Sequence, residues 1–418
     1  MASSNPCVIS ANNYFYLRGG SESVYFSEMQ LLQDAGWRVV PFSMHHELNQ
    51  QSEFSEHFVE EIEVGNAKSL IAKARLVPKS IYSFEARKKV RKLIELERPD
   101  ICHLHNIYHH LSPSFLTEFK RAGVPVVLTM HDLKVICPAY NMLTHDGVCE
   151  RCKDGNLSNV LKNKCISNSS LLSAVVFVEA TLHRFLKSYI NNVDVFIAPS
   201  RFYHDKVIEW GMPADKIRYL PNALDVSSMT PRTSVEDFFL YAGRLVEEKG
   251  VNLLIEAAAK SNSRIVIAGT GPLDQELKDQ AQQLGVDAQF TGYLEQEELN
   301  KLIHSCRAMV LPSTWYENAP MSVIEAYGQG VPVIGADIGG IPELIEKGQT
   351  GDIFEAGNSD SLAKAMNAIR ATADEEILHM GCQARKVALQ RHNKQAHLEG
   401  LLDIYRSLGV SGDTVGAA

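Results

Sequence analysis

The chain lacks the features that mark several large classes of protein. None of its 418 residues lie in an uninterrupted apolar run of about 18 residues, the length a membrane-spanning helix needs. The opening residues, MASSNPCVIS, have no basic segment before a long apolar core. We therefore expect no secretory signal and a cytoplasmic protein, with attachment to the inner membrane face left open. Aromatic residues make up 8% and apolar residues 45%, which excludes long disorder, collagen and a small disulfide scaffold.

An excess of basic residues is also missing. Lys and Arg number 41 against 50 Asp and Glu, so nucleic acid is not an expected partner. The balance is uneven: residues 1–222 hold 25 basic and 23 acidic side chains, and the rest of the chain holds 16 and 27. This contrast favours two units with different tasks. One basic run, residues 87–92, fits either a solvated helix face or contact with an anionic lipid or acceptor.

Short apolar runs, nearly continuous, recur along the whole chain. Such runs are typical of strands buried on both faces of a parallel sheet, with helices between them. They lie at residues 7–10, 38–42, 101–104, 126–129 and 195–198, then at 238–241, 264–268, 308–311 and 331–335. The pattern predicts an α/β protein with two doubly wound parallel sheets. We expect an N-terminal domain over residues 1–221 and a C-terminal domain over 222–392, divided by a turn-rich stretch.

In the second half, several loops that follow predicted strands carry chemistry. Arg244 and Lys249 are spaced to converge on a diphosphate, although two surface cations would look the same. A compact glycine loop contains Gly271. Glu317 and Glu325 flank a helix start at Pro320, where backbone N–H groups can hold phosphate and carboxylates can accept bonds from sugar hydroxyls. Helix caps and surface acids are the plainer interpretation of the glutamates.

In the first half of the chain, the loops that follow predicted strands carry weaker candidates for functional residues. A glycine pair, Gly19 and Gly20, precedes a predicted helix and suits either an anion or a simple turn. His131 ends a predicted strand and fits a ligand contact or an ordinary structural role. Candidates for an acceptor pocket surround the ends of two other strands: Asn13, Tyr14, His105 and Asn106. The segment 171–190 is apolar, which predicts a buried helix or a membrane-facing one.

Four of the eight cysteines follow His131 closely. They are Cys137, Cys149, Cys152 and Cys165, of which the middle two form a C-x-x-C pair. In a cytosolic protein this spacing favours metal over a disulfide. A structural zinc ion, free or redox-active thiols and an iron–sulfur cluster are the three states left open.

Taken together, these stretches resemble the family-4 glycosyltransferases, which are retaining enzymes of the GT-B fold. The matching motifs include "RGGSES", "VLTMHDLKVICP", "LYAGRLVEEKGV", "IAGTGP", "FTGYLEQEEL" and "PSTWYENAPMSVIEAYGQGVPVIGADIGGIPELI". The resemblance implies two Rossmann-like domains facing a cleft, with the donor held by the second and the acceptor by the first. It also implies that a last helix, about residues 393–410, crosses back to the first domain.

The resemblance further implies a role for each matching residue. Arg244 and Lys249 neutralise the donor diphosphate, Glu317 binds the donor sugar and Glu325 binds the ribose. His131 contacts the sugar near its reacting carbon. The catalytic set is thus His131, Glu317, Arg244 and Lys249. The other donor-binding positions are Gly19, Gly20, Gly271, Leu294, Asn318, Ala319, Pro320, Met321 and Glu325.

The expected activity is transfer of a hexose-type sugar from a nucleotide sugar, with UDP favoured, to a glycan or lipid-linked acceptor. The sequence has no Asp-x-Asp pair, so cationic side chains are expected to replace a metal and no cofactor is required for catalysis. Use of GDP-mannose is the first alternative. Less favoured are a sugar-nucleotide epimerase and a non-catalytic nucleotide-sugar-binding protein, because the Arg/Lys loop and the glutamate pair are all present.

Overall fold

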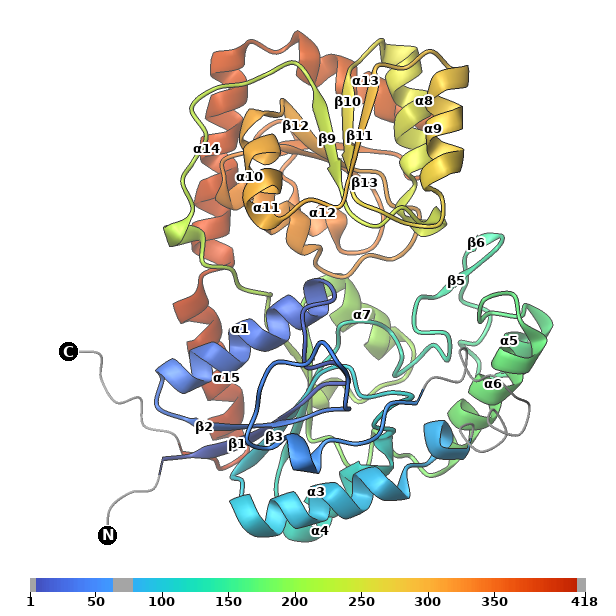
Figure 1. The fold of residues 1–418 in the computed structure, drawn as a ribbon, viewed down its shortest axis with the longest axis vertical. Helices are drawn as coiled ribbons and strands as arrows, with labels where there is room; N and C mark the ends of the chain where they lie inside the picture. Colours follow the sequence, from blue (N-terminus) through green and yellow to red (C-terminus); the bar gives the residue numbers. More distant parts are fainter. Residues whose placement is uncertain (1–4, 63–77, 412–418) are drawn as a thin grey trace. The chain divides into compact units, whose positions relative to one another are not determined.

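A computed structural model describes residues 5–62 and 78–411 (Figure 1). The chain divides into two compact units. The first takes in the described parts of Met1–Pro199 with Tyr203–Leu220 and Gln395–Ala418, and the second comprises Ser200–Phe202 and Pro221–Lys394. The division near residue 221 separates two parallel sheets, each of which is described below by itself.

The first unit is built on a six-stranded sheet in which every pairing is parallel. Its strand order is β2-β1-β3-β4-β7-β8. The strands are β1 (Cys7–Ala11), β2 (Arg38–Phe42), β3 (Ile101–Leu104), β4 (Val126–Thr129), β7 (Val195–Ala198) and β8 (Ile217–Tyr219). Strands β1, β3, β4 and β7 are buried at every position, as the continuous apolar runs predict.

Helices cover both faces of this sheet. The longer ones are α1 (Gly20–Asp34), α3 (Phe84–Glu97), α4 (Leu116–Ala122), α6 (Ser170–Phe185), α7 (Arg201–Glu209) and α15 (Lys394–Ser407). Leu32 of α1 and Leu401 of α15 belong to one buried cluster with Val8 and Ile101 of the strands, so α1 and α15 share a face. The last helix of the chain therefore completes the core of the first unit, since without it the apolar surface of these strands would be exposed.

A small irregular region follows β4. It holds a short hairpin, β5 (Leu143–Thr144) and β6 (Gly147–Val148), and a one-turn helix, α5 (Asn159–Lys162). Five non-glycine residues in this region have positive φ angles, namely Tyr140, Met142, Lys164, Ser167 and Asn168. Left-handed backbone at so many positions indicates a segment shaped by turns rather than by regular hydrogen bonding.

The second unit has its own six-stranded parallel sheet, in the order β11-β10-β9-β12-β13-β14. The strands are β9 (Phe239–Ala242), β10 (Ile265–Ala268), β11 (Ala288–Gly292), β12 (Ala308–Leu311), β13 (Val333–Ala336) and β14 (Gly351–Phe354). Both sheets are thus doubly wound, and the predicted fold class is confirmed.

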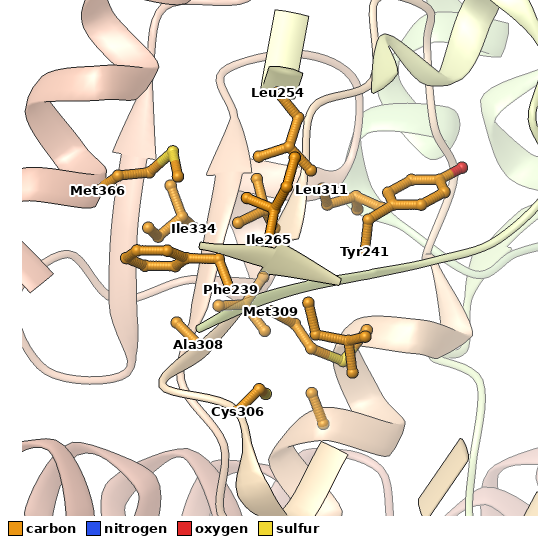
Figure 2. Close-up of a cluster of buried hydrophobic side chains, with 14 of the residues drawn as sticks. Phe239, Tyr241, Leu254, Ile265, Cys306, Ala308, Met309, Leu311, Ile334 and Met366 are labelled. Atoms are coloured by element: carbon orange, nitrogen blue, oxygen red, sulfur yellow. The ribbon is translucent and has the colours of Figure 1, made fainter. Parts of the chain in front are cut away.

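Helices also flank the second sheet on both sides (Figure 1). They are α8 (Val251–Ser261), α9 (Asp274–Gln283), α10 (Gln296–Ser305), α11 (Met321–Gly328), α12 (Ile341–Leu344), α13 (Ser359–Ala371) and α14 (Asp374–Arg391). Figure 2 shows how strand residues such as Phe239, Ile265 and Ile334 meet Leu254 of α8 and Met366 of α13 in a continuous core. This core holds the strands in place, and the loops that carry the candidate site residues begin at the ends of these strands.

Apart from the short hairpin β5–β6, three strands were not among the sequence predictions, and all three lie at the edges of the two six-stranded sheets. β8 and β11 are the outermost strands on one side of their sheets, and β14 is outermost on the other side of its sheet. Each is only partly buried and mixes polar with apolar residues, as the sequences IRY, AQFTG and GDIF of β8, β11 and β14 show. An edge strand needs no continuous apolar run, which is why these three escaped a prediction that relied on such runs.

Candidate functional site

In the second unit the candidate residues gather where the strand order reverses. β9 and β12 are neighbours in the sheet, yet the chain leaves them toward opposite sides, through β10 and through β13. Ligands of open α/β sheets bind beyond the carboxyl ends of strands at such a point. The loop after β9 carries Arg244 and Lys249, and the loop after β12 carries Glu317. Residues 68 positions apart in sequence therefore meet at one edge of the sheet.

Lys249 and Glu317 form the centre of this arrangement. Lys249 Nζ donates a hydrogen bond to Glu317 Oε1 at 2.6 Å, and Ser313 Oγ donates to the same oxygen at 2.7 Å. Burial acts to raise the pKa of Glu317, but the charge and hydrogen bonds of Lys249, with Ser313, bring the pKa below its usual value. Trp315 lies under the ammonium group, 5.2 Å from Lys249 Nζ to the ring centroid. The glutamate is therefore a fixed carboxylate at neutral pH.

The loop before α11 is held by close backbone contacts. A Cβ on Gly340 would lie 1.9 Å from the carbonyl oxygen of Asn318, and Gly340 N donates to Glu317 O at 2.8 Å. Gly250, with φ of +64°, packs against the carbonyl of Pro312, which a side chain would meet at 2.1 Å. Only glycine fits these two positions. Sequence reasoning assigned no role to either glycine or to Ser313.

Glu325 contrasts with Glu317 because its carboxylate has no partner among the described residues. It is the fifth residue of α11 and is half-buried. In the described part of the chain no hydrogen bond or ion pair reaches its carboxylate, and burial raises its pKa. The first turn of α11, after Pro320, also has no side-chain cap. A partly buried carboxylate beside uncapped N–H groups is a site at which hydroxyl and phosphate groups of a ligand would both be favoured.

Arg244 is the second cation of the site and stays available to a ligand. Its side chain is 69% exposed, and its one ion pair in the described residues is a 4.0 Å contact with Glu248 Oε1. At that distance and exposure the pair holds the guanidinium only weakly. Lys249 is 19% exposed and already bonded to Glu317, so Arg244 is the more exposed and less tightly paired of the two predicted diphosphate-binding cations.

Apart from Gly19 and Gly20, the remaining predicted donor positions also lie in the second unit. Gly271 follows β10, and a Cβ there would lie 2.2 Å from the carbonyl of Leu245. Leu294, after β11, is half-buried against the core. Of the loop before α11, Asn318 accepts a bond from Ser200 Oγ at 2.8 Å, Ala319 is buried, and Met321 is half-buried at the start of the helix. These residues therefore lie near the ends of the strands, and the contacts described above do not join all of them into one continuous site.

In the first unit the corresponding strand reversal lies between β1 and β3. Asn13 follows β1, and His105 and Asn106 follow β3. Asn13 is buried, donates through Nδ2 to Tyr108 O at 2.8 Å and so fixes the two loops to each other. Asn106 Oδ1 accepts from the Tyr108 hydroxyl at 2.8 Å. Asn13 thus acts here as a support for the loops, whereas its predicted contact with an acceptor stays a prediction.

Tyr14 and the glycine pair lie at the surface of this unit. Tyr14 is half-buried, and the Arg18 guanidinium lies 4.4 Å above its ring. Gly19 and Gly20 are exposed, with Gly19 in extended conformation as the N-cap of α1 and without a side-chain cap. The uncapped N–H groups of α1 are open to an anion, as the glycine pair predicts for a phosphate contact.

His131 directly follows Met130 after β4 and is half-buried. His131 Nε2 lies 2.8 Å from His105 Nδ1, and the two rings are stacked with an interplanar angle of 18°. Burial lowers the pKa of His131 to about 4, so the ring is neutral at pH 7. The adjacent Asp132 accepts a hydrogen bond from Tyr108, and burial raises the pKa of this carboxyl to about 6.

The four predicted metal-binding cysteines, all of them described residues, lie close enough to interact electrostatically, but their sulfur atoms do not form a compact metal-binding group. Burial raises the pKa of Cys137 to about 12 and that of Cys152 to about 11, and Cys152 is further raised by Cys165 and Cys149. Within residues 5–62 and 78–411, the one group of three ligand atoms all within 4.8 Å of each other is a different one, Glu28, His103 and His105. The thiols are close enough to interact, and zinc binding by them stays a prediction.

The structure also locates the basic run 87–92 and the apolar segment 171–190. The basic run lies on α3, where Arg87 and Arg91 bond to the buried Glu118 and thereby hold α3 against α4. Most of segment 171–190 lies in α6, which ends at Phe185, and turns follow over residues 186–190. The buried positions of α6 include Glu179 and His183, while Leu171, Val178 and Phe185 are exposed. Lys134 Nζ bonds Glu179 Oε2 at 2.8 Å, which explains why this helix buries a polar face.

Comparison with known proteins decides the family. The model described as "Glycosyltransferase Family 4" matches residues 18–228, and the model "Glycosyl transferases group 1" matches residues 230–387. The chain belongs to glycosyltransferase family 4. The two matches follow the two structural units closely, so each sheet with its helices is one half of the family's two-domain arrangement.

Curated relatives of this family-4 protein match over part of their length. An O-antigen chain mannosyltransferase of Escherichia coli is 30% identical over 191 residues, 43% of this chain and 52% of the relative. An uncharacterised glycosyltransferase of Methanocaldococcus jannaschii is 36% identical over 134 residues, 31% of this chain and 34% of the relative. The matched stretch thus spans about a third to a half of these relatives.

Solved structures match over nearly the whole chain. A sucrose-phosphate synthase of Thermosynechococcus elongatus gives a TM-score of 0.70 at 17% identity, covering 97% of this chain and 99% of that one. The Anabaena protein HepE in complex with UDP-glucose gives 0.66 at 17% identity, covering 96% and 99%. These similarities place the family-4 chain in the GT-B fold.

The helices of the described residues differ from membrane-spanning helices. None of them is both long enough and apolar enough to cross a bilayer.

Proposed function

We propose that this family-4 chain is a retaining glycosyltransferase that moves a hexose-type sugar from a UDP-sugar to a glycan or lipid-linked acceptor without a metal ion. The observation that carries the proposal is the 2.6 Å contact between Lys249 Nζ and Glu317 Oε1 beside the exposed Arg244. It brings a fixed carboxylate and two cations to one strand edge, and a sugar diphosphate needs both kinds of group.

The chemistry assigned to the cations is stabilisation of the leaving group. When the glycosidic bond to the donor breaks, negative charge grows on the departing diphosphate. Arg244 offers a planar fork and Lys249 a compact charge, which together balance that charge without a divalent ion. We assign Gly19 and Gly20 to the same phosphates, since the uncapped start of α1 offers backbone N–H groups.

The carboxylates and the histidine are assigned to orientation. Glu317, with one oxygen held by Lys249 and Ser313, accepts hydroxyls of the donor sugar, and N–H groups near Asn318 and Met321 assist it. Glu325, whose carboxylate has no partner in the described residues, binds the ribose hydroxyls. His131 contacts the sugar near the reacting carbon. The acceptor's proton passes to the leaving diphosphate as the new bond forms on the same face, so no protein nucleophile is needed.

The choice of donor base rests on similar proteins. Structures of HepE were solved with UDP and with UDP-glucose, which favours UDP, whereas a relative named as a mannosyltransferase keeps GDP-mannose as the second candidate. The test is release of nucleoside diphosphate from UDP-, GDP- and ADP-sugars, with and without EDTA. Slow, EDTA-resistant hydrolysis of one UDP-sugar is expected. Loss of turnover in EDTA would contradict metal-independent transfer, and failure to bind any of the nucleotides would contradict the function.

We also propose that the cysteine neighbourhood holds a structural zinc ion. Cys137, Cys149, Cys152 and Cys165 are thiols that interact electrostatically, and they lie in an irregular region shaped mainly by turns. A tetrahedral thiolate site would hold that region in place, and it requires only that the thiols move closer together.

Replacing the C-x-x-C pair tests this zinc proposal. Freshly reduced protein is expected to contain one zinc per chain, and Cys149→Ser with Cys152→Ser is expected to remove it and lower the melting temperature by several degrees. Cys382→Ser is the control, because Cys382 is exposed on α14 in the other unit. Elemental analysis and thermal denaturation give both readouts. Reduced wild-type protein without zinc would exclude the site.

Contact with a membrane surface is proposed for α6. Leu171, Val178 and Phe185 are spaced seven residues apart, so they follow one side of the helix, and they are 58%, 50% and 83% exposed. Arg184 and Lys187 are exposed at the same end of the helix. An apolar stripe beside cations fits the interface of an anionic bilayer, which is where a lipid-linked acceptor would be met.

Vesicle co-sedimentation tests this surface. Binding to vesicles containing an anionic lipid is expected, and Phe185→Glu is expected to weaken it at least several-fold because a charge replaces the most exposed apolar side chain of α6. Leu284→Glu is the matched control, since Leu284 is 47% exposed on the other unit. Equal binding by the two variants would show that α6 is not the contact.

A further inference from the structure

A largely buried network of one carboxylate and four imidazoles, one of which is His131, lies in the first unit. Its members come from α1, from β3 and the residues after it, from the loop after β4, and from α15: Glu28, His103, His105, His131 and His397. Glu28 Oε1 lies 2.9 Å from His397 Nε2, and Glu28 Oε2 lies 3.3 Å from His105 Nε2. His105 Nδ1 then lies 2.8 Å from His131 Nε2. The path therefore runs from the last helix of the chain to a candidate catalytic residue.

Glu28 is the charged end of this network. It is 3% exposed, and in the described part of the chain its ion-pair partners are all imidazoles. Burial acts to raise its pKa, but His103, the hydrogen bond from His397 and His105 outweigh burial and leave the pKa below its usual value. Glu28 is therefore a carboxylate at neutral pH, and its oxygen atoms can only accept hydrogen bonds.

The carboxylate determines which nitrogen of His105 bears hydrogen. Burial lowers the pKa of His105 well below its usual value, so the ring is neutral and has one N–H and one bare nitrogen. A bare Nε2 would point its lone pair at a negatively charged oxygen 3.3 Å away, which is repulsive. Nε2 therefore carries the hydrogen. The contact is too poorly aligned for a hydrogen bond, and neither atom has a hydrogen-bond partner among the described residues, so the preference is electrostatic.

The state of His105 then determines the state of His131. With its hydrogen on Nε2, His105 has a bare Nδ1. This nitrogen can only accept a hydrogen bond, here from His131 Nε2 at 2.8 Å. His131 must donate from Nε2. Because His131 is also neutral at pH 7, its Nδ1 is the bare nitrogen.

We propose that Glu28 and His105 are positioning residues that hold His131 in the Nε2–H tautomer, so that its Nδ1 presents a hydrogen-bond acceptor to a sugar hydroxyl. The assignment of the sugar to His131 rests on the proposed function, whereas the tautomer does not. An Nδ1 acceptor suits a hydroxyl, which can donate to it, and rejects a carbonyl or phosphate oxygen, which can only accept.

A cation in the network would have the opposite consequence. The ligand atoms of Glu28, His103 and His105 all lie within 4.8 Å of one another. A metal bound there would take the lone pair of His105 Nε2, so His105 would donate from Nδ1 and His131 would accept at Nε2. The tautomer of His131 therefore separates the two states of the network, and it can be measured directly.

The first experiment is long-range proton–nitrogen correlation on the full chain labelled with nitrogen-15 histidine at pH 7. The His131→Gln variant assigns the His131 ring by the loss of its signals. We expect Nε2 of His131 to bear the hydrogen and Nδ1 to be bare. The reverse pattern would overturn the proposal, and so would a charged imidazolium.

Two variants and one control test the positioning residues. Glu28→Gln removes the charge that orients His105, and His105→Phe removes the acceptor for His131, so both are expected to leave His131 in a mixture of tautomers. Tyr405→Phe is the control. The Tyr405 hydroxyl lies 2.8 Å from His103 Nδ1 and, among the described residues, makes no hydrogen bond to His105 or His131, so its loss is expected to leave the His131 spectrum unchanged. An unchanged spectrum in His105→Phe would overturn the proposal.

Kinetic and metal measurements complete the test. With the active donor, kcat is expected to fall by about 10- to 100-fold in Glu28→Gln and His105→Phe, with KM nearly unchanged, and to stay the same in Tyr405→Phe. If no donor is turned over, the proposed function fails while the spectrum still decides the tautomer. Metal that is lost in Glu28→Gln but kept in Cys149→Ser would place a cation in the network and overturn the proposal.

Discussion

Replacing Lys249 by methionine is expected to lower donor turnover by about 100- to 1,000-fold, the usual effect of removing one group that stabilises developing negative charge. The ammonium group lies 2.6 Å from Glu317 Oε1 and is assigned to the leaving diphosphate. Steady-state release of nucleoside diphosphate measures the loss. Lys278→Met on α9 is the control, because Lys278 also pairs with a carboxylate, Asp274, but lies on the surface.

Loss of Lys249 also leaves Glu317 as a buried carboxylate without its cation. The single variant is therefore expected to be less stable than the wild type, because an uncompensated buried charge is unfavourable. Adding Glu317→Gln removes both charges and is expected to recover much of the lost stability without recovering activity. A double variant with restored turnover would show that the Lys249–Glu317 pair serves stability alone.

The second large effect is expected at Glu325. Glu325→Gln should weaken UDP binding by about 10- to 100-fold, since a hydrogen bond to a charged group contributes about 1.5–3 kcal/mol. The same change should stabilise the ligand-free protein. Burial raises the pKa of this carboxyl, so the folded state disfavours the charged form that is present at pH 7. Isothermal titration with UDP and thermal denaturation measure the two effects.

The pH dependence follows from the direction of the same shift. A raised carboxyl pKa means that ligand-free wild-type protein gains stability from Glu325 as pH falls below neutral, and the Gln variant lacks that part of the gain. Glu276→Gln, an exposed substitution on α9, is the control. Tighter UDP binding in Glu325→Gln, or a less stable ligand-free variant, would remove Glu325 from the donor site.

The sequence predicted the central strands well because their chemistry is local. A strand buried on both faces, such as β3 or β4, must be a continuous apolar run, and each was found within one residue of its place. The loops with Arg244, Lys249 and Glu317 could be placed for the same reason, since each directly follows such a strand. Local pattern was enough for these parts of the fold and the site.

Contacts that depend on tertiary structure were not predictable in this way. His397 and Glu28 are 369 residues apart, and no local pattern links α15 to α1. His105 was predicted in an acceptor pocket, but its ring faces Glu28 and His131 inside the unit, with 2% of the residue exposed. The sequence also did not predict which face of α6 is buried, because that face depends on a hydrogen bond from Lys134, in another segment, to Glu179.

The anomeric configuration of the sugar first released from the active donor shows whether transfer retains or inverts the donor linkage. Proton spectra recorded as hydrolysis begins, in the presence of EDTA and before the free sugar equilibrates, identify the configuration. We expect the same configuration as in the donor, because attack and departure share one face of the sugar. Release of the inverted sugar, or no release until a divalent ion is added, would contradict this expectation.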